Sequence, residues 1–289
     1  MPAGGKWSLL GQSFGGFCAT TYLSLAPEGL EAVILTGGLP PMLCADADPV
    51  YKATFQRTLT QNAAYFERYP DDQLIASAIA RRLLKRPLTM PDGGLLTCRR
   101  FQQLGFFLGL NSFERIHFLL EQAAYPYLSS RFVAPGSTST STHHHDDHHE
   151  HHDSDDDDNA ATHEHRTHAT SLDERNALID DIESKLDLGL PFVKAIDSLL
   201  TFDTNPLYAI LHEAIYCSNT ASRWSAHRVQ NEFYPQFNLA LAADGRRLAN
   251  DQQFLFTGEM VYPWMFDDYA ALRPLKEAAE ILARKGTCS

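Results

Sequence analysis

The sequence predicts an α/β fold class, with a short strand–helix–strand unit at the start and a mainly helical region after it. Three observations support this prediction. A Gly-x-Ser-x-Gly pattern lies between an apolar run and a helix-like run near the start. A second apolar, β-branched run occupies residues 32–38. From about residue 48 onward, apolar residues recur at helical spacing.

The first element is a strand that leads into a sharp turn. Trp7-Ser8-Leu9-Leu10 suits a buried strand, and residues 17–25 can continue as a helix packed against it. Between them, Gly11-Gln12-Ser13-Phe14-Gly15-Gly16 has the pattern of a nucleophile elbow, in which a serine hydroxyl is exposed on a strand-to-helix turn. The flanking glycines are expected because side chains would clash in so tight a bend.

This turn predicts the first candidate site residues. Ser13 is the candidate nucleophile, and the backbone N–H of Phe14 is expected to supply half of an oxyanion hole. The alternative interpretation of the motif is an ordinary glycine-rich turn.

The elements that follow are a second strand and then helices. Residues 32–38 end in two glycines and suit a parallel strand beside the first, and Leu39-Pro40-Pro41 breaks regular structure. A turn is expected at Pro91-Asp92-Gly93-Gly94. Apolar spacing predicts helices over residues 51–69, 71–84, 99–110, 112–124, 205–218, 223–233 and 272–285.

Residues 135–171 differ from the rest of the chain. A Ser/Thr run leads into clustered histidines and aspartates with almost no apolar residue, so we predict a disordered insertion in a surface loop. Neutral imidazoles at this density could bind zinc, nickel or copper weakly, and metal or pH sensing is the alternative to a segment without a role.

Composition limits the function classes. The formal net charge of −12 argues against general binding to nucleic acids or anionic membranes, which need a basic face. The five cysteines are widely spaced and form no CxxC pair, which indicates a reducing compartment. Residues 1–6 contain no apolar signal region, and no apolar run approaches the roughly twenty residues of a membrane span. We therefore expect a cytoplasmic protein of unknown oligomeric state.

Few titratable residues outside the insertion are candidates for catalysis. His117, His212 and His227 lie in the helical region, where a histidine with a structural hydrogen bond is the more common case. Glu213 and Glu259 lie among apolar and aromatic residues, and a buried carboxylate needs a partner. A cationic substrate group or an internal arginine, such as Arg223 or Arg228, would serve.

Several stretches together resemble the prolyl aminopeptidases, also called proline iminopeptidases. These are serine peptidases with an α/β-hydrolase core and a helical cap. The resemblance is carried by residues 7–16, 32–41, 95–102, 203–217 and 258–266. It implies a partial α/β-hydrolase core over residues 1–47 and a helical cap over residues 48–134 and 172–289, interrupted by the insertion at 135–171.

The resemblance also implies an activity. A relative of this family would release an N-terminal residue, preferably proline, from a peptide with a free N-terminus. Ser13 would attack the carbonyl carbon of that residue, and the acidic cap residues Glu213 and Glu259 would hold its α-amino group. The chemistry needs neither a metal nor a cofactor.

The sequence departs from the family pattern in two places. It lacks the family's His-Gly-Gly-Pro-type oxyanion segment, and it lacks the strands after the cap that carry the catalytic Asp and His. We therefore expect a fragment of the enzyme that hydrolyses nothing appreciable by itself. The alternatives are another α/β-hydrolase that acts on esters or amides, and a non-catalytic paralogue that binds peptides or metals.

Overall fold

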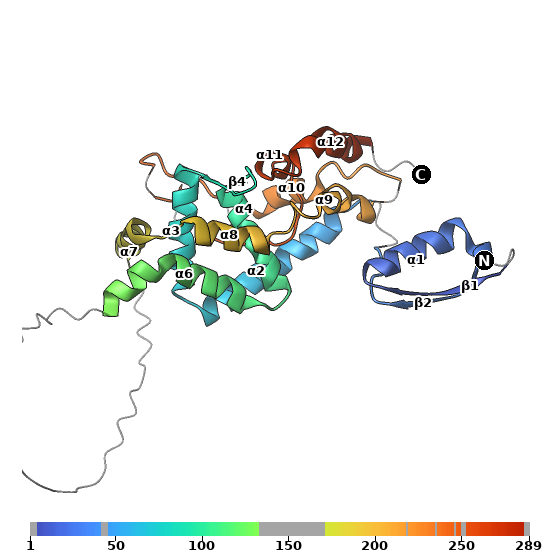
Figure 1. Ribbon diagram of the computed structural model, residues 1–289, viewed down its shortest axis with the longest axis horizontal. Helices are drawn as coiled ribbons and strands as arrows, with labels where there is room; N and C mark the ends of the chain where they lie inside the picture. Colours follow the sequence, from blue (N-terminus) through green and yellow to red (C-terminus); the bar gives the residue numbers. More distant parts are fainter. Residues whose placement is uncertain are drawn as a thin grey trace, which may run out of the picture.

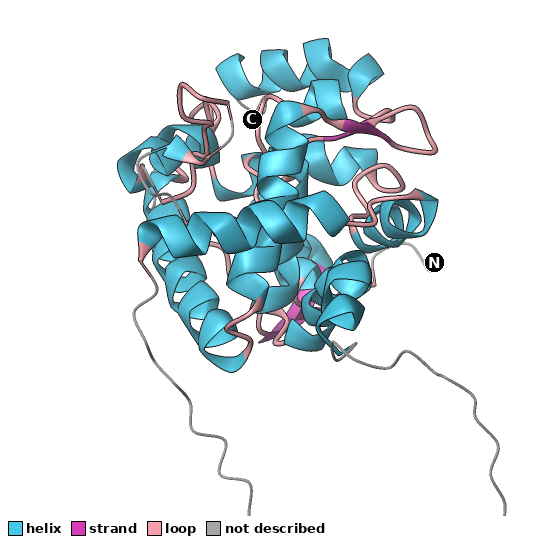
Figure 2. Cartoon of the chain, turned by 90° about the vertical axis from the view of Figure 1, so that its left-hand side faces the viewer, coloured by secondary structure: helices cyan, strands magenta, loops and turns pink. Residues whose placement is uncertain are grey.

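The structure is a computed structural model, and the residues that it describes are mainly helical with two pairs of strands (Figures 1 and 2). It describes residues 5–41, 46–132, 171–217, 219–234, 236–245, 247–249 and 253–285. The predicted insertion at 135–171 lies outside these residues except for Ser171.

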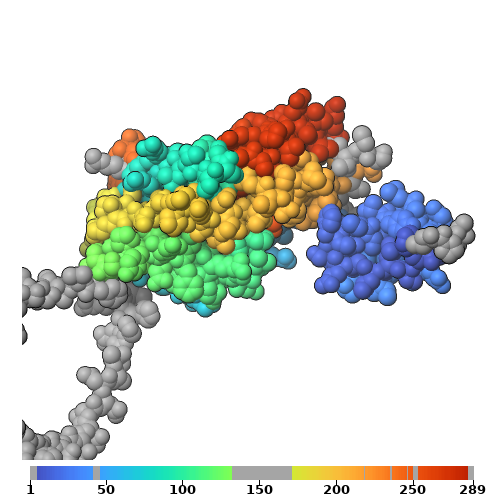
Figure 3. All heavy atoms as spheres, viewed as in Figure 1, coloured from blue at the N-terminus to red at the C-terminus, as the bar shows by residue number. Residues whose placement is uncertain are grey.

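The N-terminal unit has the predicted strand–helix–strand order. Strand β1 (Trp7–Gln12) leads into helix α1 (Phe14–Leu25), and the 3₁₀ turn η1 (Pro27–Gly29) leads into strand β2 (Leu30–Thr36). The two strands pair in parallel, with Leu10 opposite Ile34. This unit forms a lobe beside the helical part of the chain (Figure 3).

One face of this sheet is open. Leu10 and Ile34 are 71% and 57% exposed, whereas their strand neighbours Leu9, Val33 and Leu35 are partly buried. Side chains alternate between the faces of a strand, so α1 covers only one side of the β1–β2 pair. The other face of the two-stranded sheet is therefore uncovered by described residues.

The helical part begins with two long amphipathic helices. In α2 (Asp48–Arg68), the buried residues Tyr51, Phe55, Asn62 and Tyr65 follow the helical period and face the core. Helix α3 (Asp72–Lys85) buries most of its length, including Arg81. The hairpin of β3 (Leu88–Thr89) and β4 (Leu95–Leu96) encloses the predicted turn. It is followed by α4 (Cys98–Gln102), η2 (Gln103–Gly105), α5 (Phe106–Gly109) and α6 (Phe113–Phe132).

The second half of the helical part starts directly after the insertion. Helix α7 (Leu172–Lys185) begins with a capping box in which the side chains of Ser171 and Glu174 each accept from the other residue's backbone N–H. The elements that follow are α8 (Leu190–Leu199), α9 (Pro206–Leu211), η3 (Ala214–Tyr216), α10 (Ser225–Gln230), η4 (Asn231–Phe233), α11 (Met265–Asp268), η6 (Arg273–Leu275) and α12 (Lys276–Lys285). No helix in the described ranges is long and apolar enough to cross a membrane.

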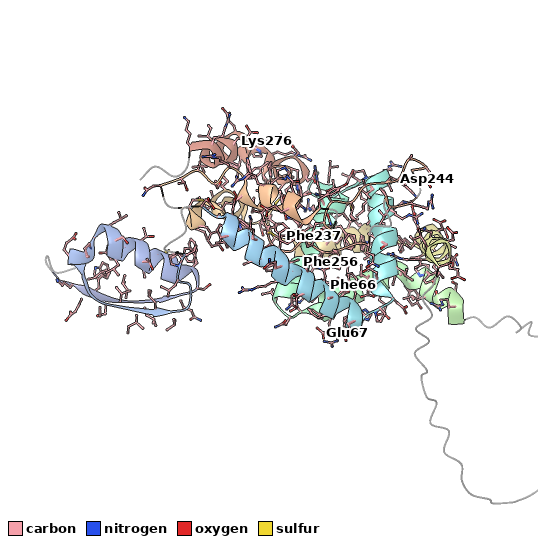
Figure 4. The ribbon with its side chains drawn as sticks, turned by 180° about the vertical axis from the view of Figure 1, so that it is seen from behind. Phe66, Glu67, Phe237, Asp244, Phe256 and Lys276 are labelled. Carbon is pink, nitrogen blue, oxygen red and sulfur yellow. The ribbon has the colours of Figure 1, made fainter. Side chains whose placement is uncertain are left out.

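Residues 253–264 form an irregular, mostly buried segment that joins two hydrophobic cores. Phe254 and Phe256 belong to the core around α3, α6, α7 and α8. Met260 and Tyr262 belong to the core that α2, α10, α11 and α12 share. Figure 4 shows Phe237 and Phe256 in the interior beside α2. This segment also carries Glu259.

Several predicted helices have different bounds in the structure. The helix predicted over 99–110 is broken into α4, η2 and α5, and the one over 205–218 ends at Leu211. The helix predicted over 112–124 instead continues to Phe132 through Pro126. Helices α7 and α8 were not predicted individually. These differences arise where tertiary packing overrides local propensity.

Candidate active site

The turn between β1 and α1 has the geometry of a nucleophile elbow. Ser13 has φ 53° and ψ −124°, a conformation that non-glycine residues rarely adopt and that stores local strain. Its backbone oxygen accepts from the N–H of Gly16 at 2.9 Å, and the residue is exposed. The strained turn therefore presents the Ser13 hydroxyl outward, as the motif predicts.

The close approach of backbone around the turn explains three glycines. A Cβ on Gly11 would lie 2.5 Å from the backbone oxygen of Gly15, and one on Gly16 would lie 2.5 Å from that of Gly38. A Cβ on Gly38 would lie 1.7 Å from the backbone oxygen of Ser13, and Gly38 also has φ +74°. Gly15 has open space, so no described neighbour requires a glycine there.

The position of Phe14 suits its predicted role. It is the first residue of α1, and the first backbone N–H groups of a helix have no intrahelical acceptor. Its N–H therefore remains available for an oxyanion next to Ser13. The role as oxyanion donor is still a prediction.

Helix α1 contacts an aromatic cluster on the helical part. The ring of Phe17, one turn after Ser13, packs edge-on against Tyr216 at 6.1 Å between centroids. Tyr216 in turn packs against Tyr51 and His212. Burial, and then the charge of Glu259, raise the pKa of Tyr216. The cluster thus links the elbow helix to the surroundings of Glu259.

Glu259 borders an open cavity of about 410 Å³. Apolar side chains form most of its wall, among them Phe106, Leu200 and Phe202. The carboxylate accepts a hydrogen bond from the Tyr208 hydroxyl, and burial raises the pKa of Glu259 despite this bond. A partly buried carboxylate at the wall of an apolar cavity favours a cationic ligand group, because the cation offsets the cost of desolvation.

Side-chain amides hold the irregular segment that carries Glu259. A segment without helix or strand partners needs other hydrogen-bond partners for its buried backbone groups. Four amide side chains supply them. Asn62 donates to the backbone oxygen of Phe256 and accepts from its N–H, both at 2.8 Å. The other three donate to backbone oxygens: Gln73 to Phe254 at 3.0 Å, Gln102 to Leu255 at 2.9 Å and Gln103 to Met260 at 3.0 Å. The position of Glu259 therefore depends on helices α2, α3 and α4 and on turn η2.

Glu213 is placed differently from Glu259. Its carboxylate oxygens accept the backbone N–H groups of Ser225 and Ala226 at 2.9 and 2.8 Å, at the first turn of α10. Burial raises the pKa of Glu213, and these bonds oppose the shift. The cavity beside it measures about 20 Å³, the size of one water molecule. Backbone N–H groups thus provide the partner that a buried carboxylate needs.

Neither arginine that could have paired with Glu213 forms an ion pair with it among the described residues, although the charge of Arg228 acts to lower the pKa of Glu213. Arg228 donates to the Asp48 carboxylate at 2.5 Å and to the backbone oxygen of Ser222 at 2.8 Å. Arg223 has φ 51° and is followed by Trp224, also left-handed, directly before α10. A role for Glu213 in substrate binding remains a prediction.

The described histidines have structural surroundings. Nδ1 of His212 lies 3.0 Å from the Tyr51 hydroxyl, and burial lowers the pKa of His212 to about 4. Nδ1 of His117 lies 3.1 Å from the Asp72 carboxylate, and its ring stacks on Tyr69 at 4.0 Å. His227 borders a different cavity from that of Glu259. Within the described ranges, no hydrogen bond joins a histidine to Ser13.

Three carboxylates gather at one further position. Oxygens of Asp92, Asp197 and Asp203 lie within 4.8 Å of one another. The fully buried guanidinium of Arg100 lies 2.9 Å from Asp203 and 3.7 Å from Asp197. Because this arginine already supplies the compensating positive charge, we assign no metal to the cluster.

Some residues that shape the site were not predicted from sequence. Gly38 is needed because it touches the backbone of Ser13, and the only signal for it was the Gly37-Gly38 pair after a strand. Tyr208 contacts Glu259, which lies 51 positions further along the chain, and Asn62 contacts Phe256, which lies 194 positions further along. Local sequence patterns do not reveal such contacts.

Comparison with known proteins gives consistent results. Residues 3–88 match the family described as alpha/beta hydrolase fold. The chain is 38% identical over 280 residues to the proline iminopeptidase of Aeromonas sobria, covering 96% of this chain and 49% of that protein. It is 28% identical over 282 residues to the proline iminopeptidase aneH of Aspergillus aculeatus, covering 96% and 48%. The chain spans about half the length of these curated relatives.

Proposed function

We propose that this chain provides the nucleophile and the substrate-binding cap of an aminopeptidase, because it is similar to two proline iminopeptidases and its residues 3–88 match the alpha/beta hydrolase fold family. The substrate would be a peptide with a free N-terminus, from which the first residue, preferably proline, is released. The observation that carries this proposal is the exposed, strained Ser13, whose helix contacts the aromatic cluster beside Glu259.

In the proposed reaction, Ser13 Oγ attacks the carbonyl carbon of the N-terminal residue. The Ser13 proton passes to a general base, the carbonyl oxygen takes the negative charge, and the Phe14 N–H donates to it. As this intermediate collapses, the base gives its proton to the leaving nitrogen, and the remaining peptide departs as an amine. Water then gives a proton to the base and attacks the serine ester, which releases the first residue and restores the Ser13 hydroxyl. Among the described histidines, His212 and His117 contact Tyr51 and Asp72, and His227 lines a different cavity. We therefore propose that the chain alone has no appreciable Ser13-dependent activity.

Recognition of the α-amino group is assigned first to Glu259. An exopeptidase must bind a cation at a fixed distance from the scissile bond, and a desolvated carboxylate does this well. The cavity at Glu259 has room for a proline ring and an apolar wall to receive it. Glu213 is proposed as a second acidic contact, although its carboxylate would have to keep its bonds to α10 or exchange them.

A single experiment distinguishes the proposed function from its alternatives. In the proline iminopeptidase of Aeromonas sobria, the matching 280 residues are replaced by those of this chain. We expect the chimera to release 2-naphthylamine from proline 2-naphthylamide and Ser13→Ala to abolish the release. Glu259→Gln should lower kcat/KM for this substrate by about tenfold or more, but leave hydrolysis of 4-nitrophenyl acetate unchanged.

Other outcomes would favour other functions. An equal loss of kcat/KM on both substrates in the Glu259→Gln variant would indicate an esterase or amidase that does not recognise a free amino group. A well-folded chimera without Ser13-dependent hydrolysis would favour a non-catalytic protein.

We also propose a cytoplasmic location, since Cys18, Cys98 and Cys217 are free thiols in the structure.

A further inference from the structure

A second large cavity lies in the helical part, away from the proposed substrate cavity. It measures about 430 Å³ and is bounded by the end of α3, by α4, by α10 and by residues 257–264. It shares no lining residue with the cavity at Glu259. Its volume is within the range of small-molecule sites, roughly 300 to 1,000 Å³. Phe237, at its wall, is labelled in Figure 4.

The wall of this cavity is mostly apolar and aromatic. Leu83 and Phe237 are almost fully buried, and Tyr262 stacks on Trp264 at 5.3 Å between centroids. These side chains suit the flat apolar body of a ligand. They do not favour a strongly hydrated ligand, because the water bound to it would have to be removed on binding.

One polar group at the wall has no ordinary hydrogen bond. Thr257 is 3% exposed, and its hydroxyl makes no hydrogen bond of regular geometry within the described part of the chain, although a hydrogen bond from it acts to lower the pKa of the Tyr262 hydroxyl. A buried hydroxyl without a well-formed hydrogen bond is unfavourable. A ligand group or a water molecule in the cavity would remove this cost.

The other available polar groups are uncharged. Gln230 is 9% exposed and lines the cavity, and no hydrogen bond joins its carboxamide to another described residue. His227 stands at the exposed side, and burial of its ring lowers its pKa, which favours the neutral imidazole. Hydroxyl, carboxamide and neutral imidazole can each both donate and accept a hydrogen bond.

Arg99 is the one cation among the described lining residues, and it is already neutralised. Arg99 forms two hydrogen bonds of 2.9 Å to the carboxylate of Asp268, and its guanidinium lies over the ring of Trp264 at 4.8 Å. An anionic ligand would have to displace Asp268, and a cationic one would find no free carboxylate among the described lining residues. The cavity therefore favours a ligand without net charge.

We propose that this cavity is a binding site for a small uncharged ligand with a flat apolar body and one amide-type group. The amide would donate to and accept from Thr257 and Gln230, and the ring would pack against Phe237 and Trp264. This site is independent of the proposed peptidase function, since it shares no residue with the cavity at Glu259.

Three probes of the same ring size test the proposal on the full chain: benzamide, benzoate and benzylamine. Binding is measured by ligand-observed NMR titration and by the fluorescence of Trp264, with Trp264→Phe as the blank. We expect saturable benzamide binding with a millimolar Kd, and at least tenfold weaker binding of the two charged probes.

Matched variants locate the binding. Thr257→Val keeps the side-chain shape and should weaken benzamide binding about tenfold, the value of one hydrogen bond. Thr201→Val makes the same change in the cavity of Glu259 and should have no effect. If Thr257→Val fails to fold, as judged by circular dichroism, Gln230→Leu replaces it with the same expectation.

The contrary results are equally definite. Equal affinity for the three probes, or an unchanged benzamide Kd in a folded Thr257→Val variant, would overturn the proposal. So would the absence of saturable benzamide binding at tens of millimolar, which would show that the cavity holds water only.

Discussion

Replacing Asn62 by leucine should strongly destabilise the helical part. Asn62 is 1% exposed on α2, and its side chain donates to the backbone oxygen of Phe256 and accepts from its N–H, both at 2.8 Å. Leucine has a similar size, so the substitution removes the partners without opening a large cavity. Both backbone groups of Phe256 would then stay buried and unsatisfied.

The size of the effect can be worked out from these two groups. Each buried backbone group without a partner costs about 1–3 kcal/mol, so the pair costs about 2–6 kcal/mol. The neighbouring bonds from Gln102 to Leu255 and from Gln103 to Met260 keep the segment in the core, so it cannot turn these groups toward water. We expect a loss of about 4 kcal/mol in the free energy of unfolding.

Urea unfolding followed by circular dichroism at 222 nm measures this loss. Gln56→Leu is the control, because Gln56 is exposed on the same helix and undergoes a similar amide-to-leucine change. The control should alter the free energy of unfolding by no more than about 0.5 kcal/mol. A loss below about 1 kcal/mol for Asn62→Leu would refute the reasoning that side-chain amides anchor this segment.

Three further changes test other parts of the structure. Gly38→Ala should disrupt the elbow, because its Cβ would lie 1.7 Å from a backbone oxygen. Gly37→Ala meets a similar backbone strain, at φ +81° against +74°, but has open space, so it should show smaller amide chemical-shift changes across residues 7–38. His212, with a folded pKa of about 4 against about 6.5 unfolded, should contribute about 3 kcal/mol of stability that is present above pH 6.5 and lost as the pH falls toward 4. His212→Asn should remove most of that pH dependence in urea unfolding, and an unchanged slope would argue against it. Arg81 is a buried cation that pairs with Asp180 and Glu183 on α7, so Arg81→Met should speed proteolysis within α7. Arg82 is exposed, and Arg82→Met should leave the cleavage rate unchanged.

Local sequence signals predicted the elbow well because the chemistry is local. A strand, a serine with positive φ and a helix are specified within residues 7–25, and the glycines at 11 and 16 report directly on the close backbone contacts. The parallel partner strand follows from its β-branched run. The motif could therefore be recognised without any long-range information.

The surroundings of the two glutamates could not be predicted in the same way. Glu213 and Glu259 both appeared as carboxylates among apolar residues. The structure distinguishes them, because backbone N–H groups in the first turn of α10 donate to the Glu213 carboxylate, whereas Glu259 borders an open cavity. These contacts depend on how an irregular segment crosses the core, and periodicity carries no information about such a segment.

The central claim, that Ser13 is the nucleophile of a hydrolase, is tested most directly by covalent labelling. The chimera is treated with a fluorophosphonate, which reacts with activated serines, and the modified peptide is identified by mass spectrometry. The account predicts a single adduct on Ser13, with no adduct and no hydrolysis of proline 2-naphthylamide in Ser13→Ala. An adduct on another serine, together with undiminished hydrolysis by Ser13→Ala, would contradict it.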